Sequence, residues 1–402
     1  MPASNTKPLF VLDCLAMVQH GILLLMLGPL VPGIMESFAI GESAIGVLLS
    51  VGSLGFMVGP APAGLIIDRR GVKSIFLAGT AIELAFLMMF GFSRLFLLSV
   101  LANFFVNVGA GFVETGANVV PTLLHGRRSA HSTMNFIHLF FSLGALLAPL
   151  LIGAFLEVSG HWHDVPLLVL VPTAILLFAS GLVRMPGPLP STNTANSDDS
   201  GSLPLVRRLT LFGGATLFFY VGAEVGVSAW IILYLIETLR FTGLQAASAL
   251  SLLWASIMAG RFLNGALGNR RKTPTLVLLS GLGGAVGVLI LVATNSGVVA
   301  YVSVCWIGLG LAGIYPNVMA EVNRRTPRRD GAVTGMLATF GAAGAAAFQW
   351  IIGSIAERSS LRIALLVPAI LQVLAVVSFM IAIAGDRRQI DVVTGRNHPN
   401  SS

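Results

Sequence analysis

The chain has 402 residues, of which 55% are hydrophobic and only 10% are charged. A soluble domain usually carries about 25% charged residues, so this composition excludes an ordinary soluble globular protein. The net charge is +7, but the basic residues lie in short clusters between apolar blocks, and we therefore expect no binding to nucleic acid. The two cysteines, Cys14 and Cys305, both fall in apolar blocks, which predicts neither a disulfide framework nor a zinc site.

Apolar blocks of about 20 residues follow one another along the chain, and each could cross a hydrocarbon core of roughly 30 Å as a helix. The first block is too long for the core of a signal peptide, so it is predicted to be a retained span. The sequence predicts an all-α integral membrane protein with twelve transmembrane helices, because the alternation typical of a β-barrel is missing. The predicted spans are residues 9–35, 44–67, 74–93, 95–124, 132–157, 164–185, 209–237, 244–268, 274–294, 297–321, 331–356 and 361–384.

A polar stretch rich in proline and serine, from Pro186 to Pro204, separates the sixth and seventh spans and is typical of a linker. The predicted organisation is an N-terminal six-helix bundle over 1–185, a cytoplasmic linker over 186–208, a C-terminal six-helix bundle over 209–385 and a disordered cytoplasmic tail over 386–402. With the N-terminus in the cytoplasm, 19 of the 24 lysine and arginine residues lie on the cytoplasmic side and 4 on the other. This asymmetry predicts a multi-pass protein of the cell inner membrane with both termini in the cytoplasm.

The two halves repeat each other at an offset close to 200 residues. Gly144 and Gly153 precede Glu157 in the fifth span, and Gly344 and Gly353 precede Glu357 at the same spacing in the eleventh. Two similar halves joined by a linker are typical of a secondary transporter that works by alternating access, in which one bundle rocks against the other.

The segment that follows the second span reads GLIIDRRGVK, from Gly64 to Lys73, and it resembles the signature loop of the major facilitator superfamily. A partial copy, Asn269-Arg270-Arg271, follows the eighth span. We expect Gly64 to let two helices approach closely, Asp68 to accept hydrogen bonds across the bundle interface, and the cations to face the anionic inner leaflet. The conformational gate inferred from this loop comprises Gly64, Asp68, Arg69, Gly71, Lys73 and also Arg261, which could instead snorkel or pair with a carboxylate across the cavity.

Within that superfamily, the chain is similar to the fucose–proton symporter family of sugar transporters. The similarity lies in the segment ETGAN from Glu114 to Asn118, in NFIH from Asn135 to His138, and in the stretch of the seventh span that begins at Tyr220. The resemblance implies a major facilitator fold and places the proton-linked carboxylate of the family at Glu114. The chain departs from the family pattern at Gly28, where the family has an aspartate four residues before a proline.

Polar groups inside the spans are the candidates for transport, because an ionised side chain is costly in the bilayer and is usually functional. Glu114 lies roughly 16 Å from the cytoplasmic end of its helix, near the midplane. It is the predicted proton-coupling residue together with His138, although either side chain could be structural. Glu83 is the third deep acid and is assigned a structural role. The predicted substrate-binding residues are Asn118, Asn135, Tyr220, Glu224, Ser228, Asn317 and Gln349, with Gln19, His20 and Trp254 as further candidates for lining the pore.

The favoured function is transport of a small polar solute, a sugar or a related compound, with proton symport. A proton-antiport exporter of drugs or metabolites is the first alternative, and a non-transporting membrane sensor is the second. The chain has no nucleophile elbow, zincin motif or P-loop, so we expect no enzyme activity, no cofactor and no bound metal. The expected partners are the solute, protons and membrane lipids, and the chain is expected to work as a monomer.

Overall fold

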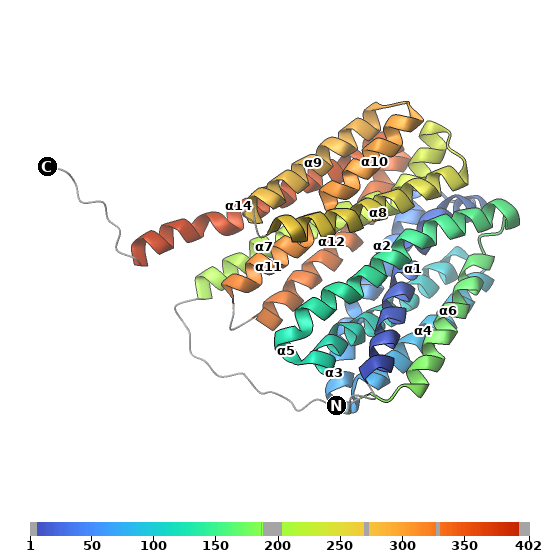
Figure 1. Cartoon of the computed structure of the whole chain (residues 1–402). Coiled ribbons are helices and arrows are strands. Elements are labelled where there is room, and N and C mark those ends of the chain that lie inside the picture. The colour runs from blue at the N-terminus through green and yellow to red at the C-terminus, as the bar shows by residue number, and fades with distance from the viewer. Residues whose placement is uncertain (1–5, 186, 188–202, 269–272, 327–329, 394–402) are drawn as a thin grey trace.

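The computed structural model describes residues 6–185, 187, 203–268, 273–326 and 330–393, and within these ranges the regular structure is entirely α-helical (Figure 1). The helices are α1 Thr6–Phe38, α2 Glu42–Val58, α3 Pro60–Arg70, α4 Val72–Phe92, α5 Phe96–Ser159, α6 Asp164–Leu182, α7 Leu203–Leu239, α8 Gly243–Gly268, α9 Thr273–Ala293, α10 Gly297–Leu311, α11 Ile314–Arg325, α12 Asp330–Arg358, α13 Leu361–Ala364 and α14 Leu366–Val393.

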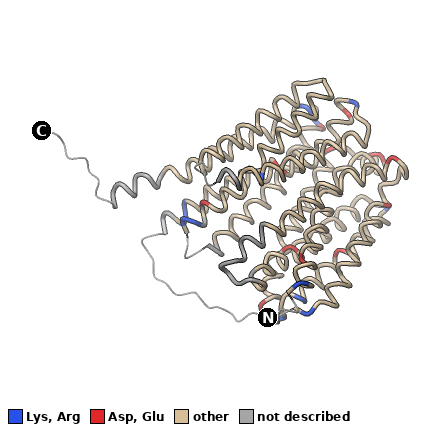
Figure 2. Tube along the Cα trace, in the orientation of Figure 1, with Lys and Arg blue, Asp and Glu red and all other residues tan. Residues whose placement is uncertain are grey.

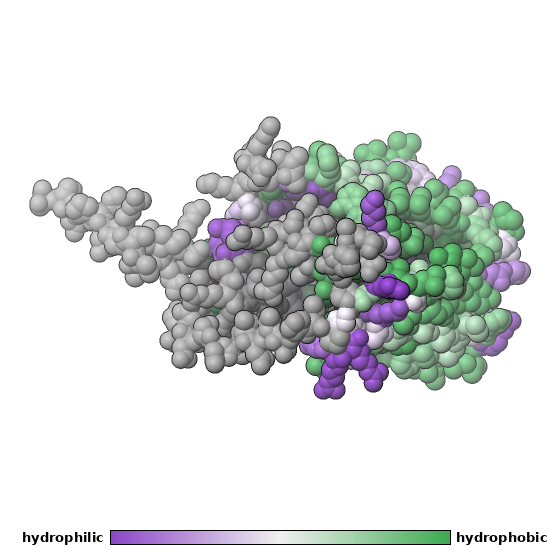
Figure 3. Space-filling model, turned by 60° about the horizontal axis from the view of Figure 1, so that its bottom comes forward, coloured by the Kyte–Doolittle hydropathy of each residue, from purple (hydrophilic) through white to green (hydrophobic). Residues whose placement is uncertain are grey.

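Twelve segments of the described chain are long and apolar enough to span a membrane, which confirms the predicted number of spans. Helices α2 and α3 form one span, α10 and α11 another and α13 and α14 the last, whereas α5 contributes two spans, Phe96–Pro121 and Phe136–Ser159. Most charged residues lie at the two ends of the molecule (Figure 2), and apolar surface covers the region between the hydrophilic groups (Figure 3). This distribution suits a protein whose middle faces lipid.

Helices α1 to α6 form one bundle and α7 to α14 form the other, with α1, α2 and α5 packed against α7, α8 and α12 where the bundles meet. The predicted linker lies largely outside the described residues, but α7 begins at Leu203, inside the predicted 186–208 range. The predicted disorder of the tail is wrong for residues 386–393, because α14 continues as a helix to Val393.

The sequence repeat has a direct counterpart in the packing of glycines. A Cβ atom added to Gly144 would lie less than 3.0 Å from the backbone of Val18 in α1. One added to Gly344 would meet the backbone of Phe218 in α7 in the same way. Corresponding glycines therefore let the fifth and eleventh spans approach the first span of their own bundle closely. Gly310 is a further position of close helix packing, since a Cβ there would collide with Gly284 of α9.

The bundles are closely packed at one end of the molecule, which we call the closed end. There a Cβ added to Gly153 would meet Ala247 of the other bundle, and one added to Gly353 would meet the carbonyl oxygen of Glu42, both at less than 3.0 Å. Two backbone amides also donate across the interface, Ser43 N to Glu357 Oε2 at 2.7 Å and Leu244 N to Glu157 Oε1 at 3.3 Å.

The opposite end, which we call the termini end, carries the first and last described residues and the α3–α4 loop (Figure 1). A Cβ added to Gly64 or to Gly335 there would meet no atom of the residues that the structure describes within 4 Å. Gly64 and Gly335 lie on α3 and α12, the extensions of the same two spans that touch tightly at the closed end. Helix α2 packs along α12, whereas α3, the extension of the same span, makes few or no contacts with the described part of α12. These two spans are therefore in contact at the closed end and apart at the termini end.

Candidate functional site

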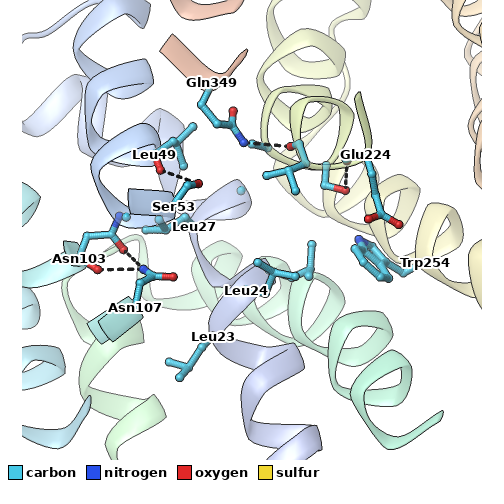
Figure 4. Close-up of a pocket in the computed structure, with 16 residues that line it drawn as sticks. Leu23, Leu24, Leu27, Leu49, Ser53, Asn103, Asn107, Glu224, Trp254 and Gln349 are labelled. Atoms are coloured by element: carbon cyan, nitrogen blue, oxygen red, sulfur yellow. Dashed lines mark hydrogen bonds between the residues drawn. The ribbon is translucent and has the colours of Figure 1, made fainter. Parts of the chain in front are cut away.

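A cavity lies between the two bundles, lined by residues of α1, α2, α5, α7, α8 and α12. In Figure 4, Asn103 and Asn107 face the cavity from one side and Glu224 and Trp254 from the other. Much of the remaining lining is leucine, so a few polar groups mark the cavity walls.

Two asparagines of α5 are cavity residues that the sequence analysis missed. Asn103 is buried and donates from Nδ2 to the carbonyl oxygen of Leu48 in α2 at 2.8 Å. Asn107, one helical turn later, donates to the backbone and side-chain oxygens of Asn103 at 2.8 and 3.0 Å. This chain of hydrogen bonds fixes both amides, and Ser53 adds a hydroxyl beside them. The signal was present in the sequence as an amide pair at i and i+4 in an apolar span.

Helix α1 adds backbone acceptors to the cavity through its two prolines. Pro29 and Pro32 have no N–H, so the carbonyl oxygens of Leu25 and Gly28 lack the donor that an unbroken helix would supply four residues later. Both Leu25 and Gly28 line the cavity. Two backbone carbonyls beside the cavity are therefore free of their usual helical partner.

On the opposite wall, Glu224 lies at the centre of a polar cluster on α7 and α8. The hydroxyl of Tyr220, which is fully buried, donates to Glu224 Oε1 at 2.6 Å, and Arg261 Nη2 lies 3.6 Å from the same oxygen. Ser228, one turn beyond Glu224, also lines the cavity and donates to the Glu224 carbonyl oxygen. The structure thus brings together the predicted residues Tyr220, Glu224 and Ser228, and it places Arg261 in this cluster and not beside the α3–α4 loop.

The amide of Gln349 lines the cavity but has structural partners. Its Oε1 accepts from Trp230 Nε1 at 2.8 Å, and its Nε2 donates to the Val225 carbonyl oxygen at 3.1 Å. One N–H of this amide is left for a ligand. Asn317 of α11, also predicted to bind substrate, donates to the carbonyl oxygen of Gly313, just before that helix, and does not line this cavity.

Glu114 and His138 lie beside this cavity and not in its lining. Glu114 is half-buried and accepts a hydrogen bond from Asn118. Tyr315 of α11 is close enough to Glu114 and to Glu224 to interact with both carboxylates electrostatically. His138 lies in the same relation to Arg261. The predicted coupling residues on α5 therefore face the Glu224 cluster of the other bundle. Asn135 is in α5, but its side chain lies outside the described residues.

The predicted gate loop differs from expectation at two positions, Gly64 and Asp68. The expected close helix approach at Gly64 is wrong in this conformation for the described part of the chain, none of whose atoms lies within 4 Å of a Cβ there. Asp68 and Arg69 are exposed, and no side chain in the described residues pairs with Asp68. Gly71 has φ 80°, which favours glycine between α3 and α4. Lys73 donates to the carbonyl oxygens of Gly181 and Val183, at 2.6 and 3.2 Å.

Two acids are buried away from the cavity. Asp13 on α1 is fully buried, and neither carboxylate oxygen has a partner among the described residues. The sequence analysis did not include it among the deep acids, because it lies close to the predicted start of the first span. Glu83 on α4 is also buried, with its Oε2 unpartnered in the described chain and its backbone packed against Gly109 of α5. Gln19, on the Asp13 helix, donates to Thr173 of α6.

Comparison with known proteins places this architecture in a family. The model of the major facilitator superfamily matches residues 14–349. A glucose/galactose transporter of Brucella abortus is 26% identical over 326 residues, which cover 77% of this chain and 78% of the relative. The L-fucose-proton symporter of Escherichia coli is 24% identical over 269 residues, covering 58% of this chain and 61% of the relative.

Two solved structures show the same fold. The D-xylose-proton symporter has a TM-score of 0.79 at 13% identity and covers 93% of this chain and 97% of its own. The Escherichia coli fucose:proton symporter, solved as a single-residue variant, has a TM-score of 0.64 at 19% identity and covers 93% of this chain and 98% of its own. With twelve spans, two repeated bundles and a family match over most of its length, the chain belongs to the major facilitator superfamily of membrane transporters.

Proposed function

We propose that the protein carries a monosaccharide or a closely related polyhydroxylated solute across the membrane. The observation that carries the proposal is the lining of the cavity, where neutral amides and a hydroxyl on one bundle face a carboxylate and an indole on the other. Such groups suit hydroxyls, which both donate and accept hydrogen bonds. The names of the glucose/galactose and fucose relatives support the same substrate class. The cavity forms within one chain, which supports a monomer as the working unit.

We also propose an orientation and a conformational state. The excess of lysine and arginine at the termini end supports a cytoplasmic location for that end, and the closed end then faces outward. With the bundles tightly packed outside and spans 2 and 11 apart inside, the structure corresponds to an inward-facing carrier. Transport requires the opposite arrangement as well, in which the two bundles rock about the cavity.

Proton symport is the proposed source of energy, with Glu114 as the coupling carboxylate. Its position is half-buried and near the bundle interface. Water can therefore reach Glu114 in one conformation of the carrier and is excluded from it in the other. A carboxylate near the midplane is costly when charged, so its protonation state should depend on which conformation is present. Asn118 and Tyr315 are its nearest polar neighbours that the structure identifies.

The test is uptake of radiolabelled D-glucose, D-galactose, L-fucose and D-xylose into proteoliposomes, with and without an inward-directed proton gradient. We expect at least one sugar to accumulate only with the gradient. Glu114→Gln keeps the shape of the neutral acid and removes its titration, so it should abolish accumulation and retain counterflow exchange. Glu83→Gln makes the same exchange at a buried acid away from the cavity and serves as the matched control, which should retain gradient-driven uptake. Accumulation by Glu114→Gln against a gradient would overturn the coupling role.

A drug exporter is the alternative function, and its cavity should be lined by different side chains from those of a sugar carrier. Cavities that take lipophilic drugs are expected to be rich in aromatic and methionine side chains, whereas Trp254 is the one aromatic residue among the described cavity-lining residues, and none of them is methionine. Efflux of a lipophilic dye from the same proteoliposomes, without uptake of any sugar, would favour the exporter. Absence of both activities would favour the non-transporting sensor.

A further inference from the structure

Buried polar atoms without a hydrogen-bond partner are rare in folded proteins, and each one needs an explanation. In the described part of this chain they occur on eight residues, namely Asp13, Gln19, His20, Ser50, Glu83, Ser251, Trp254 and Gln372. Trp254 is the one member of this set that lines the cavity between the bundles. Its side chain is 2% exposed, so bulk water does not satisfy its indole N–H in this conformation.

The other buried indoles show that an unpaired N–H is exceptional here. Trp162 donates from Nε1 to Ser37 Oγ at 2.9 Å, and Trp230 donates to Gln349 Oε1 at 2.8 Å. Even Trp306, which is about half exposed, donates to the Gly283 carbonyl oxygen at 2.9 Å. Among the buried indoles of the described chain, Trp254 alone has no partner, and its ring faces the cavity beside Glu224 (Figure 4).

The ring of Trp254 is also held in place from the opposite bundle. Phe141 of α5 contacts it edge to face, with ring centroids 5.7 Å apart and the planes inclined at 80°. Phe141 in turn packs on His20 of α1. A Trp ring fixed in this way presents its N–H to the cavity without loss of side-chain freedom when a ligand arrives, which favours its use in recognition.

We propose that Trp254 Nε1–H is a substrate-binding donor, which hydrogen bonds one oxygen of the transported sugar and so determines which sugars bind. The inference rests on the proposed sugar transport, and it identifies the indole N–H as the protein group that binds one oxygen of the substrate. An indole N–H donates and cannot accept, so its partner on the ligand is an oxygen with a free lone pair. A sugar that lacks this oxygen leaves the buried N–H unpaired, and such a site rejects analogues strongly.

The experiment measures equilibrium binding of D-glucose, D-galactose and L-fucose to the full-length protein in lipid nanodiscs, followed by the monodeoxy analogues of the sugar that binds best. In the wild type, we expect one analogue to bind about 3- to 30-fold more weakly than its parent. The parent sugar should bind Trp254→Phe more weakly than the wild type by a similar factor. The deoxy analogue should bind Trp254→Phe and the wild type with the same affinity. The penalties of the missing hydroxyl and the missing N–H should therefore not add, because both remove one hydrogen bond.

Two further variants separate the N–H from the ring. Replacement of Trp254 by benzothienylalanine keeps the bicyclic shape and puts sulfur in place of N–H, so it should reproduce the loss seen in Trp254→Phe with the fold intact. Trp306→Phe removes an indole N–H that is already paired and lies outside the cavity, and it should leave sugar affinity unchanged.

The outcomes distinguish this inference from the proposed function. A wild type that binds none of the sugars would overturn both. Sugar binding that is unchanged by benzothienylalanine at position 254 would overturn the role of Trp254 alone. An equal loss for the parent and every deoxy analogue would also overturn it, because the N–H would then serve the protein, for instance Glu224, and not a particular oxygen of the substrate.

Discussion

The two ends of the bundle interface use the same spans in opposite ways. At the closed end, Gly353 and Gly153 bring backbones of different bundles into contact, and Glu357 and Glu157 each accept a hydrogen bond from the first turn of a helix in the other bundle. At the termini end, a Cβ added to Gly64 or Gly335 would meet no atom of the described residues within 4 Å, and Asp68 has no side-chain partner among them. The comparison indicates that glycine contacts and carboxylate caps select which end is shut.

The largest effect is expected from a side chain placed in the tight contact at the closed end. Gly353→Ala puts a methyl group against the Glu42 carbonyl oxygen and should destabilise this conformation by about 1–3 kcal/mol, shifting the population by about 5- to 150-fold. Spin labels at Val158 and Ser359, one on each bundle at this end, should report longer distances by double electron–electron resonance.

Gly64→Ala is the matched control for that variant. Its new methyl group meets no atom of the described chain in this conformation, so the label distances at the closed end should match those of the wild type. Equal distances for Gly353→Ala and the wild type would show that the contact does not hold the end shut.

A smaller effect is expected from the two carboxylate caps. The negative charge of Glu357 lies at the N-terminus of α2, where it stabilises the exposed amides, and Glu157 occupies the corresponding place at α8. Glu357→Gln and Glu157→Gln should each lengthen the same label distances less than Gly353→Ala does, and the double variant should do so more than either.

The neighbouring acid Glu36 provides the control for the caps. It is exposed at the same end and takes part in no side-chain hydrogen bond that the structure describes, so Glu36→Gln should leave the distances unchanged. A response of Glu36→Gln equal to that of Glu357→Gln would reduce the effect to a change in net charge.

The smallest effect on this conformation is expected at the termini end. Asp68 is exposed and has no partner among the described residues, so Asp68→Asn should not alter the label distances at the closed end. It should nevertheless lower the rate of transport, because we expect Asp68 to hold the opposite conformation, in which the termini end is shut. Transport assays and distance measurements on one preparation test both parts, and a wild-type rate would refute the role of Asp68.

Much of the fold was predictable because the bilayer imposes length and composition on each span. The predicted span of residues 361–384 matches Leu361–Ala384, and the repeat of Gly144 at Gly344 recurs as a packing contact. The face of α7 that carries Tyr220, Glu224 and Ser228 also followed from helical spacing. These features depend on local periodicity, which a single sequence contains.

The remainder of the site depends on which helices meet. The place of Asn103 in the cavity wall depends on α2, whose Leu48 carbonyl oxygen fixes the amide. Gln349 has less hydrogen-bonding capacity left for a ligand than expected, because Trp230 of another helix donates to its oxygen. The unpaired N–H of Trp254 is likewise visible only once its surroundings are known. In a single sequence, a neutral amide outside a family motif carries a weaker signal of function than a charged side chain in a span.

The hydrogen bonds of Lys73 bear on where a dye can be placed to follow the opening and closing of single carrier molecules by fluorescence. By joining the start of α4 to the last carbonyls of α6, Lys73 ties two neighbouring helices of the first bundle together at the termini end. A fluorophore at Phe178, on the exposed side of α6, should consequently move with α4 as one rigid unit. Paired with a dye on the second bundle, it should report each opening of the carrier as a step in energy transfer, and Lys73→Ala should blur those steps by letting α6 move independently.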